Sequence, residues 1–396
     1  MGFFDDRPLN LAPASVRDHR GQARRRLPRQ LFDYIDGGAY EESTMRGNEA
    51  AFDAIQLRQR VLRDVSEITL STTVLGRELR IPAILAPVGL CGMFAKRAEV
   101  SAARAAESFG VPFCESTVSI CSIEEVAAAT TAPMWFQLYV MRDRSYAQDL
   151  MARAAAAGAE ALVLTVDMAV VGERYRDTRN GMTVPVGPVA KVIKGLDLVR
   201  HLRWLREVGI GGKPHTFGNL VDAVPGASTP EDFKAWVDAQ FDPSVTWGDL
   251  EWVREHWHGP LVLKGVLDAD DARVAADMGV DALVVSNHGG RQLDATPPSV
   301  SVLPGVIDAV GDRVEVLMDG GIRSGLDIVK ALSLGARAVL VGRPWAWAVA
   351  GGGEAAVAQV LTTLEREMYV AMGLCGRTDV ADLDHTVLAN PVVANR

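Results

Sequence analysis

The stretch "EVLMDGGIRSGLDIVKALSLGARAVLVGRP", residues 315–344, decides the fold. It contains an apolar run, a glycine turn, a segment with helical periodicity that closes on glycine, and a second apolar run. The same unit repeats from about residue 81 onward, and eight of its runs have the length and composition of strands: 81–87, 111–117, 134–140, 161–167, 261–266, 282–288, 315–321 and 338–344. Eight strands that alternate with helices predict an α/β fold of the TIM (β/α)8 barrel type.

A doubly wound open sheet is built from the same unit, but its dinucleotide fingerprint is missing. The first strand is followed by "LAPVGLCGMF", residues 85–94, and not by G-x-G-x-x-G. We therefore expect a barrel over residues 81–380, a helical and extended lead-in over 1–80 that packs on it, and a tail over 381–396. In the lead-in, "ARRRLPRQLFDYIDGGA", residues 23–39, predicts a first helix that ends at Gly37 and Gly38.

One interval breaks the repeat. Residues 168–246 separate the fourth strand from the helical segment "WGDLEWVREHWH", which is far longer than a usual loop between a strand and a helix. Inside it, residues 190–206 place apolar side chains at helical spacing, namely Val192, Leu196, Val199, Leu202 and Leu205. Positive charges are interleaved with them, namely Lys191, Lys194, Arg200, Arg203 and Arg206. Two interpretations stay open: a lid helix packed on the barrel, or a helix that lies on an anionic membrane surface.

Composition excludes several classes of protein. The chain has 396 residues, 48% hydrophobic content and a formal net charge of −9, and such an acidic balance argues against a nucleic-acid partner. Its four cysteines are scattered without zinc-type spacing, which favours reduced core thiols, no metal site and a cytosolic location. The start "MGFFDDRPLN" is unlike a signal peptide, and no later run is long enough to span a bilayer.

The carboxyl ends of barrel strands carry active sites, so the last residues of each strand are candidates. In this chain these residues are mostly polar: Ser116, Gln137, Tyr139, Thr165, Asp167, Lys264, Ser286, His288, Asp319 and Arg343. Because the carboxyl ends of all eight strands meet at one rim, these side chains together predict a lined pocket there.

The loops after the seventh and eighth strands are the usual phosphate-binding loops of barrels, and here they read "DGGIRSG" and "GRP". Gly320, Gly321 and Gly342 allow the backbone to approach an anion, and Arg323 and Arg343 can bond its oxygens. These turns predict a phosphorylated ligand or cofactor.

His288 is followed by two glycines that leave space around its ring, and by Arg291, which can bind a carboxylate. Asp167 lies on the same predicted rim and can orient the imidazole as the acidic member of a general-base pair. A base beside an anion-binding arginine suits a hydroxy acid substrate.

These residues carry a family resemblance. "SNHGGRQLD", residues 286–294, resembles the signature of the FMN-dependent 2-hydroxy acid oxidising enzymes, and "FDYIDGGA", "WFQLY", "TVD", "YRDTRNGM", "LKG", "DGGIRSG" and "GRP" follow the family order over nearly the whole chain. Within the family, "APVGLCGM", "MWFQLYVMRDR" and "FDPSVTWGDLEW" most resemble the bacterial respiratory L-lactate dehydrogenases.

The resemblance implies a role for each residue of the rim. His288 would be the base, Asp167 its partner, Arg174 and Arg291 the carboxylate-binding pair, and Tyr34 and Tyr139 hydrogen-bonding partners of the substrate. Lys264 would stabilise the reduced flavin. The other expected contacts to FMN are Pro87, Val88, Gly89, Ser116, Gln137, Thr165, Ser286, Asp319, Gly321, Arg323, Gly342 and Arg343.

The same resemblance implies oxidation of an L-2-hydroxy acid, most simply L-lactate to pyruvate, and a homotetramer. Gly89 favours a dehydrogenase over an oxygen-using oxidase, and a membrane quinone as electron acceptor fits the basic segment near Leu196 on the inner face of the cell membrane. Alternatives that stay open are an oxygen-using oxidase, a relative acting on a larger acid such as mandelate, and a non-catalytic barrel that binds phosphorylated ligands. Glu115 departs from the family pattern, and strand alternation predicts that it faces away from the flavin.

Overall fold

The computed structural model describes residues 11–182, 186–221, 223 and 239–390. Eight parallel strands form one sheet in the order β3-β10-β9-β8-β7-β6-β5-β4. Their bounds are Ala83–Leu85 (β3), Cys114–Ser116 (β4), Trp135–Leu138 (β5), Ala161–Thr165 (β6), Leu261–Val266 (β7), Ala282–Val285 (β8), Glu315–Met318 (β9) and Ala338–Val341 (β10). A parallel bridge between Leu85 and Phe113 joins β3 to the start of β4 and closes the ring. The predicted barrel is confirmed, with each strand inside its predicted run.

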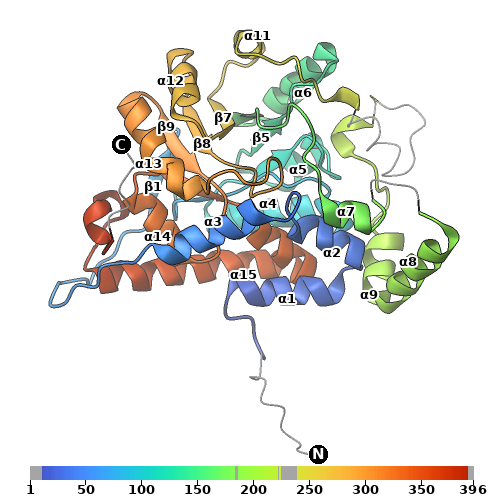
Figure 1. Ribbon diagram of the computed structural model, residues 1–396, viewed down its shortest axis with the longest axis horizontal. Helices are drawn as coiled ribbons and strands as arrows, with labels where there is room; N and C mark the ends of the chain where they lie inside the picture. The colour runs from blue at the N-terminus through green and yellow to red at the C-terminus, as the bar shows by residue number, and fades with distance from the viewer. Residues whose placement is uncertain (1–10, 183–185, 222, 224–238, 391–396) are drawn as a thin grey trace, which may run out of the picture.

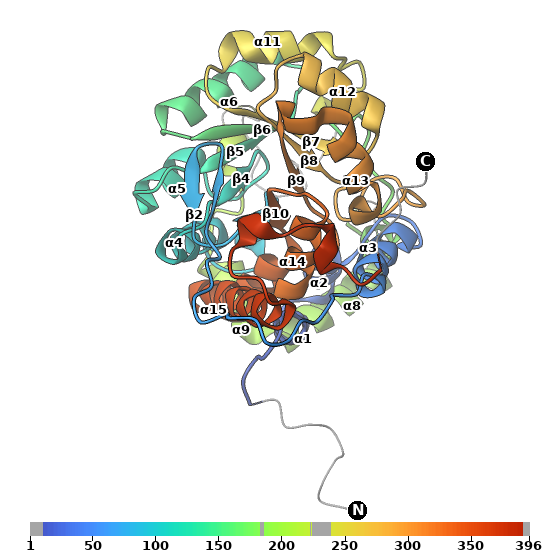
Figure 2. The same ribbon diagram turned by 90° about the vertical axis from the view of Figure 1, so that its left-hand side faces the viewer.

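Helices surround the ring, and Figures 1 and 2 show them outside the strands. The helices that connect successive strands along the chain are α4 (Ala98–Phe109), α5 (Ile123–Ala129), α6 (Arg144–Ala156), α11 (Gly248–His256), α12 (Ala269–Asp277), α13 (Ser299–Val310) and α14 (Gly325–Ser333). The last helix, α15 (Arg343–Cys375), bends at Gly353 and packs against α1, α4 and α14.

Side-chain alternation along the strands separates two apolar layers. One fills the barrel interior and includes Ile84, Trp135, Val163, Val262 and Leu340. The hairpin of β1 (Thr72–Val74) and β2 (Arg77–Leu79) adds Val74 and Leu79 to this layer. The other layer lies between strands and helices. All four cysteines are buried and unpaired, as expected of core thiols.

The lead-in differs from its prediction in one respect. The expected first helix is two helices, α1 (Val16–Arg26) and α2 (Arg29–Asp36), interrupted at Leu27 and Pro28. Proline disfavours the helical conformation in the residue before it, so Leu27 is extended and α1 ends there. The predicted end at Gly37 is correct, because Gly37 caps α2. A third helix, α3 (Ser43–Ala54), packs against α13.

The insertion also differs from a single helix over 190–206. It contains α7 (Tyr175–Arg179), α8 (Pro188–Arg200), the short α9 (Leu202–Trp204) and a π-helical turn, Leu205–Ile210, with the break at His201. Trp204 and Val208 are buried and anchor the second part, whereas α8 has no buried residue. Figure 1 shows α8 at the periphery of the molecule. α8 contacts the rest of the chain through the half-buried Leu198 and through Asp197, which accepts from the Arg29 amide at 2.7 Å, while several of its other apolar residues stay exposed.

Candidate active site

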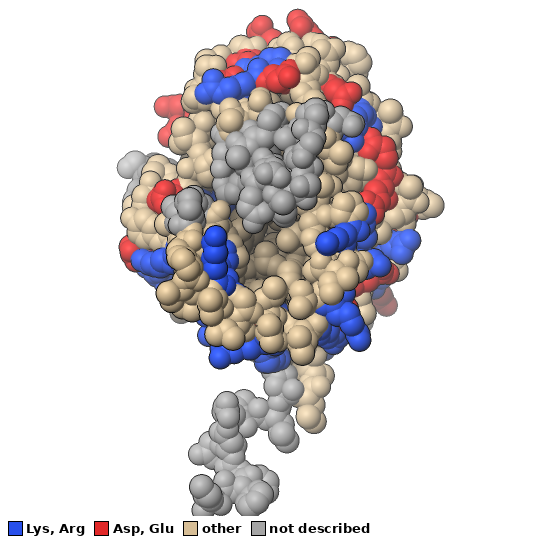
Figure 3. Space-filling view, turned by 90° about the vertical axis from the view of Figure 1, so that its right-hand side faces the viewer, with Lys and Arg blue, Asp and Glu red and all other residues tan. Residues whose placement is uncertain are grey.

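A cavity of about 440 Å³ opens at the carboxyl ends of the strands. The face that carries the insertion is hollowed near its centre, and Lys and Arg side chains lie to the left and right of the hollow (Figure 3). Most of the expected site residues line the cavity: Tyr34, Pro87, Val88, Gly89, Ser116, Tyr139, Arg174, Lys264, His288, Arg291, Asp319, Gly321, Arg323, Gly342 and Arg343. Four others, Gln137, Thr165, Ser286 and Asp167, are buried or half-buried beside it. Residues from all parts of the chain thus meet at one rim, as the barrel predicts.

His288 and Asp167 form a hydrogen-bonded pair. The Nδ1 atom of His288 lies 3.0 Å and 3.2 Å from the two carboxylate oxygens of Asp167. Burial lowers the pKa of His288 below its usual 6.5, although Asp167 pulls it upward. Burial in turn pushes the pKa of Asp167 upward, but His288 and Lys264 outweigh it and the pKa is lowered. The pair is therefore a neutral imidazole and a carboxylate near pH 7, and Nε2 of such a ring can accept a proton.

Backbone geometry brings the pair together. His288 has a φ of +56°, which is uncommon for a residue other than glycine and marks a constrained position. Gly265 on β7 has a φ of +111°, and a Cβ there would lie 2.7 Å from the Cβ and Cγ of Asp167. Only glycine leaves room for this carboxylate. Gly265 was not among the residues expected in the site, and the signal that could have revealed it is a glycine inside an otherwise apolar strand.

Arg174 and Arg291 both lie close to the ring of Tyr34. Arg291 donates from Nη1 to the carbonyl oxygens of Tyr34 and Gly37, at 2.7 Å and 2.8 Å. The guanidinium carbons of Arg291 and Arg174 lie 5.1 Å and 5.9 Å from the centre of the Tyr34 ring. Burial is the main cause that lowers the pKa of Arg291, to about 10, and the nearby charge of Arg174 adds to it. Two cations held this close favour an anion between them, and a carboxylate has the matching geometry.

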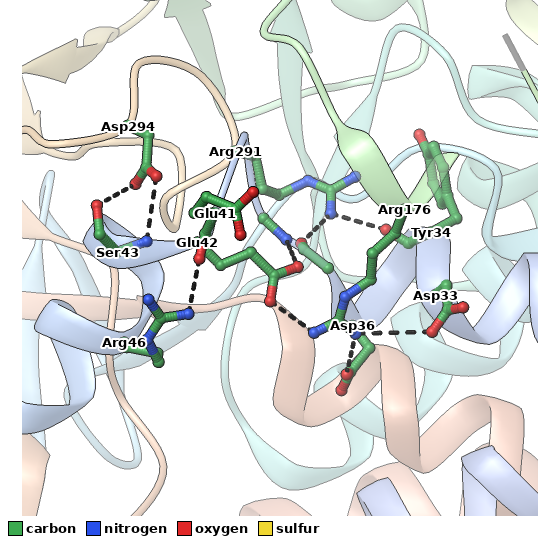
Figure 4. A network of polar contacts seen from close by, with 12 residues as sticks. Asp33, Tyr34, Asp36, Glu41, Glu42, Ser43, Arg46, Arg176, Arg291 and Asp294 are labelled. Carbon is green, nitrogen blue, oxygen red and sulfur yellow. Dashed lines mark hydrogen bonds and ion pairs between the residues drawn. The ribbon is translucent and has the colours of Figure 1, made fainter. Parts of the chain in front are cut away.

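A network of carboxylates fixes the loop that carries Arg174. Arg176 on α7 contacts Asp36 at 3.0 Å and Glu42 at 2.6 Å, and Figure 4 shows its guanidinium directed at these carboxylates. Arg20 also donates to both carboxylate oxygens of Asp36, from Nε at 2.5 Å and from Nη2 at 2.8 Å. These pairs join α7 to α2, which carries Tyr34. Sequence reasoning missed Arg176, because its partners come from distant segments.

Several buried polar atoms in and beside the cavity lack a partner among the described residues. Among the described residues, four atoms of the expected FMN contacts are buried without a hydrogen-bonding partner: Gln137 Nε2, Thr165 Oγ1, Asp319 Oδ1 and Arg343 Nε. Buried polar groups in native proteins are nearly always satisfied, so a polar ligand fits here. Lys264 is held close by, with Nζ 2.9 Å from Asp319 and donating to Ser286 at 3.1 Å. Burial disfavours its charge, but Asp319 and Asp167 raise its pKa above the usual value.

The loops after β9 and β10 form a positive end of the cavity. Burial and the charges of Arg291 and Arg323 hold the pKa of Arg343 well below its ordinary value. Arg343 donates to the carbonyl oxygens of Gly289 and Gly37, at 2.9 Å and 2.7 Å, and it begins α15. Arg323 contacts Glu49 at 3.0 Å. Clustered guanidiniums at a helix N-terminus fit a phosphate, so the residues present suit FMN.

Two further positions test the sequence expectations. A Cβ at Gly89 would lie 2.6 Å from Cγ2 of Val118, so a larger residue there requires Val118 to move. Glu115 faces away from the barrel interior, as alternation with the interior Cys114 predicts. It is fully buried, and burial followed by the charge of Glu99 raises its pKa well above the usual value. Burial therefore favours the neutral form of the Glu115 carboxyl, which lies outside the cavity.

Bacterial proteins and solved structures resemble nearly the whole chain. Two bacterial proteins named L-lactate dehydrogenase match it: that of Caulobacter vibrioides is 55% identical over 96% of this chain and 98% of its own, and that of Yersinia pestis is 50% identical over 94% and 97%. Among solved structures, a monotopic membrane protein, (S)-mandelate dehydrogenase, superposes with a TM-score of 0.90 at 37% identity, covering 96% of this chain and 99% of its own. A mandelate oxidase gives 0.80 at 39% identity, over 93% and 97%.

The sequence profile of the FMN-dependent dehydrogenases matches residues 23–390. This match covers the end of α1, the helices α2 and α3, every barrel strand and the insertion, and it agrees with the cavity described above. The chain belongs to the FMN-dependent dehydrogenase family.

Proposed function

We propose that this enzyme oxidises an L-2-hydroxy acid, with L-lactate as the best substrate and pyruvate as the product. The observation that carries the proposal is the His288–Asp167 pair at the same cavity rim as Arg174 and Arg291. The relatives named L-lactate dehydrogenase, at 50% and 55% identity, favour lactate. FMN, when bound, supplies the two-electron acceptor for this chemistry.

The chain's own residues divide the remaining work. Arg291 and Arg174 bind the substrate carboxylate, which places the substrate α-carbon in a fixed position. His288 takes a proton from the substrate at Nε2, and Asp167 holds the ring and stabilises the resulting imidazolium through Nδ1–H. Burial raises the pKa of Tyr139, so its hydroxyl stays protonated and can donate a hydrogen bond to the substrate.

The unsatisfied atoms and the positive end of the cavity support the cofactor contacts that the family resemblance implies. Arg323, Arg343 and the glycine turns at Gly321 and Gly342 would hold the phosphate, and Asp319 would bind the ribityl chain. The ring would contact the Pro87–Val88–Gly89 turn together with Ser116, Gln137, Thr165 and Ser286. Lys264 would place its charge beside the ring edge, where it favours the electron-rich reduced form.

We further infer that α8 lies on a membrane surface and that the acceptor is a quinone. Four apolar residues of α8 and α9 are largely exposed: Val192 by 62%, Leu196 by 58%, Val199 by 59% and Leu202 by 63%. None of the described helices is long and apolar enough to cross a bilayer. A basic amphipathic helix with its apolar side exposed fits attachment to the interface of an anionic membrane. The relative described as a monotopic membrane protein supports this inference.

Flotation with anionic liposomes tests the membrane inference. We expect the intact enzyme to float and the variant Leu196→Asp/Val199→Asp to stay in the dense fraction. Leu374→Asp, which changes an equally exposed leucine on α15, is the control and should float. An intact enzyme that stays in the dense fraction would contradict the inference.

The predicted tetramer is a separate expectation. Light scattering in detergent measures the oligomeric state of the enzyme.

Anaerobic reduction tests the catalytic proposal. The purified holoenzyme is mixed with L-lactate, glycolate and (S)-mandelate, and flavin absorbance is followed; we expect L-lactate to reduce it fastest. Reoxidation is then timed with oxygen and with a short-chain quinone, and we expect the quinone to be faster. (S)-Mandelate is the second candidate, since Phe217 and Phe241 give the cavity aromatic walls.

A further inference from the structure

A second cavity, of about 410 Å³, lies beside the first. It runs between the carboxyl ends of β6 and β7 and the segment that leads into α11. Its volume is in the range of small-molecule sites. Tyr139, Met168 and Phe241 line both cavities, so these three side chains are the boundary between them.

Phe241, one of the three boundary residues, is held in place by contacts of both its ring and its backbone. Its ring contacts the ring of Tyr139 edge to face, with centroids 5.4 Å apart and planes at 78°. Its backbone forms an antiparallel bridge with Met141, and Arg142 donates from its amide to the Gln240 carbonyl at 2.9 Å. The backbone around Phe241 is thus held against the end of β5, which keeps the ring between the two spaces.

A pair of ion contacts fixes the next residues. Arg144 on α6 contacts Asp242 and Asp249, each at 2.8 Å. Asp242 also accepts from Ser244 at 2.7 Å, and Asp249 from the Thr246 amide at 2.8 Å. The outer wall of the second cavity is therefore fixed to α6.

The chemistry of the second cavity selects the occupant. Its apolar lining includes Leu164, Val166, Val245, Trp247, Leu250, Leu263 and Val266. Lysine, arginine and histidine are absent from the described residues that line it, whereas Asp242, Asp249 and Asp271 are present. An anionic group has no partner there, but a hydrocarbon chain gains by leaving water.

We propose that Phe241 determines substrate specificity by closing the second cavity, and that this cavity accepts the unbranched aliphatic side chain of a longer 2-hydroxy acid once Phe241 is reduced in size. The inference rests on the proposed function for the position of the reacting group. The side chain of lactate, a single methyl group, needs no space beyond the first cavity. A chain of six carbons would pass the boundary where the Phe241 ring now lies.

The test compares the wild-type holoenzyme, Phe241→Ala and Phe241→Ala/Val245→Phe. Val245 lines the second cavity and not the first, so the added phenylalanine refills only the new space. We expect Phe241→Ala to raise the ratio of kcat/KM for L-2-hydroxyoctanoate over L-lactate by roughly tenfold or more, since several methylenes enter an apolar pocket. The double variant should return the ratio to near the wild-type value. L-2-Hydroxyglutarate should gain nothing, because its chain ends in a carboxylate.

Binding gives a readout that does not need turnover. 2-Oxooctanoate has neither a hydroxyl group nor a hydrogen on C2, so the enzyme cannot oxidise it. Calorimetry should show roughly tenfold tighter binding to Phe241→Ala than to the wild type and to the double variant. Equal affinities in the three proteins overturn the inference, as does an unchanged kcat/KM ratio in Phe241→Ala. If L-lactate fails to reduce the wild-type flavin, the proposed function fails while the binding comparison still decides the role of Phe241. Phe241→Leu, a smaller change, repeats the test if Phe241→Ala does not fold.

Discussion

Replacing Gly265 by alanine tests the geometry of the proton-accepting pair. Gly265 has a φ of +111°, a backbone conformation that residues other than glycine rarely adopt. A Cβ at this position would lie 2.7 Å from two carbons of Asp167, well inside the ~3.5 Å that carbon atoms prefer. Asp167 must therefore shift by roughly 1 Å if the strand stays in place, which disturbs its position relative to His288.

Two contributions set the size of the Gly265→Ala effect: the backbone strain at Gly265 and the displacement of Asp167. The backbone strain alone costs about 1–3 kcal/mol of folding free energy. The displacement of Asp167 loosens a hydrogen bond of 3.0 Å, and a misplacement of about 1 Å in a catalytic group can cost ~100-fold in rate. We expect Gly265→Ala to unfold at lower temperature and to reduce its flavin with L-lactate ~10- to 100-fold more slowly.

A matched control separates strain from displacement. Gly279 also has a positive φ, +75°, but a Cβ there meets nothing within 4 Å. Gly279→Ala should lose stability and keep its rate. Stopped-flow flavin reduction under anaerobic conditions measures the rate, and thermal unfolding measures the stability. A Gly265→Ala enzyme that reduces its flavin at the wild-type rate would refute the reasoning.

Variants at three other positions probe neighbouring parts of the site. His288 must be neutral to accept a proton and its pKa lies below 6.5, so the kcat/KM of the wild type should fall only when the pH drops below that value. Asp167→Asn removes the charge that raises the pKa of His288, so the fall should move to still lower pH and the reaction should slow ~10²- to 10⁴-fold. A pH–rate profile measures both effects. Arg343→Gln should weaken FMN binding ~10- to 100-fold in a fluorescence titration, and unchanged affinity would count against the phosphate site. Arg176→Ala should raise KM for L-lactate ~10-fold with a smaller loss in kcat, since it positions Arg174, and Arg176→Lys should recover part of the loss; a fall in kcat alone would contradict this.

The features that could be predicted from the sequence are those that repeat or that lie at strand ends. Buried strands of a parallel barrel are continuous apolar runs, so the eight strands could be counted along the chain, and the strand ends placed His288, Asp167 and Arg291 on one rim. The break at Pro28 could also have been predicted, because proline carries its own signal.

Other features depend on the approach of distant segments. The Gly265 contact with Asp167 joins β7 to the end of β6, and the partners of Arg176 come from α2 and the turn before α3. The boundary at Phe241 arises because residues 240–242 pair with the chain after β5. Such contacts leave no local pattern. Sequence reasoning also could not predict that α8 keeps its apolar side exposed, since an amphipathic helix has the same pattern when it packs on a barrel.

The most direct measurement compares anaerobic flavin bleaching by L-lactate in the wild-type enzyme and in His288→Gln. The purified wild type should be yellow and should bleach rapidly. His288→Gln should bind FMN with the same spectrum and bleach at least ~100-fold more slowly, because the imidazole that accepts the proton is gone. Equal bleaching rates in the two proteins, or a wild-type protein that is colourless and takes up no added FMN, would contradict the account.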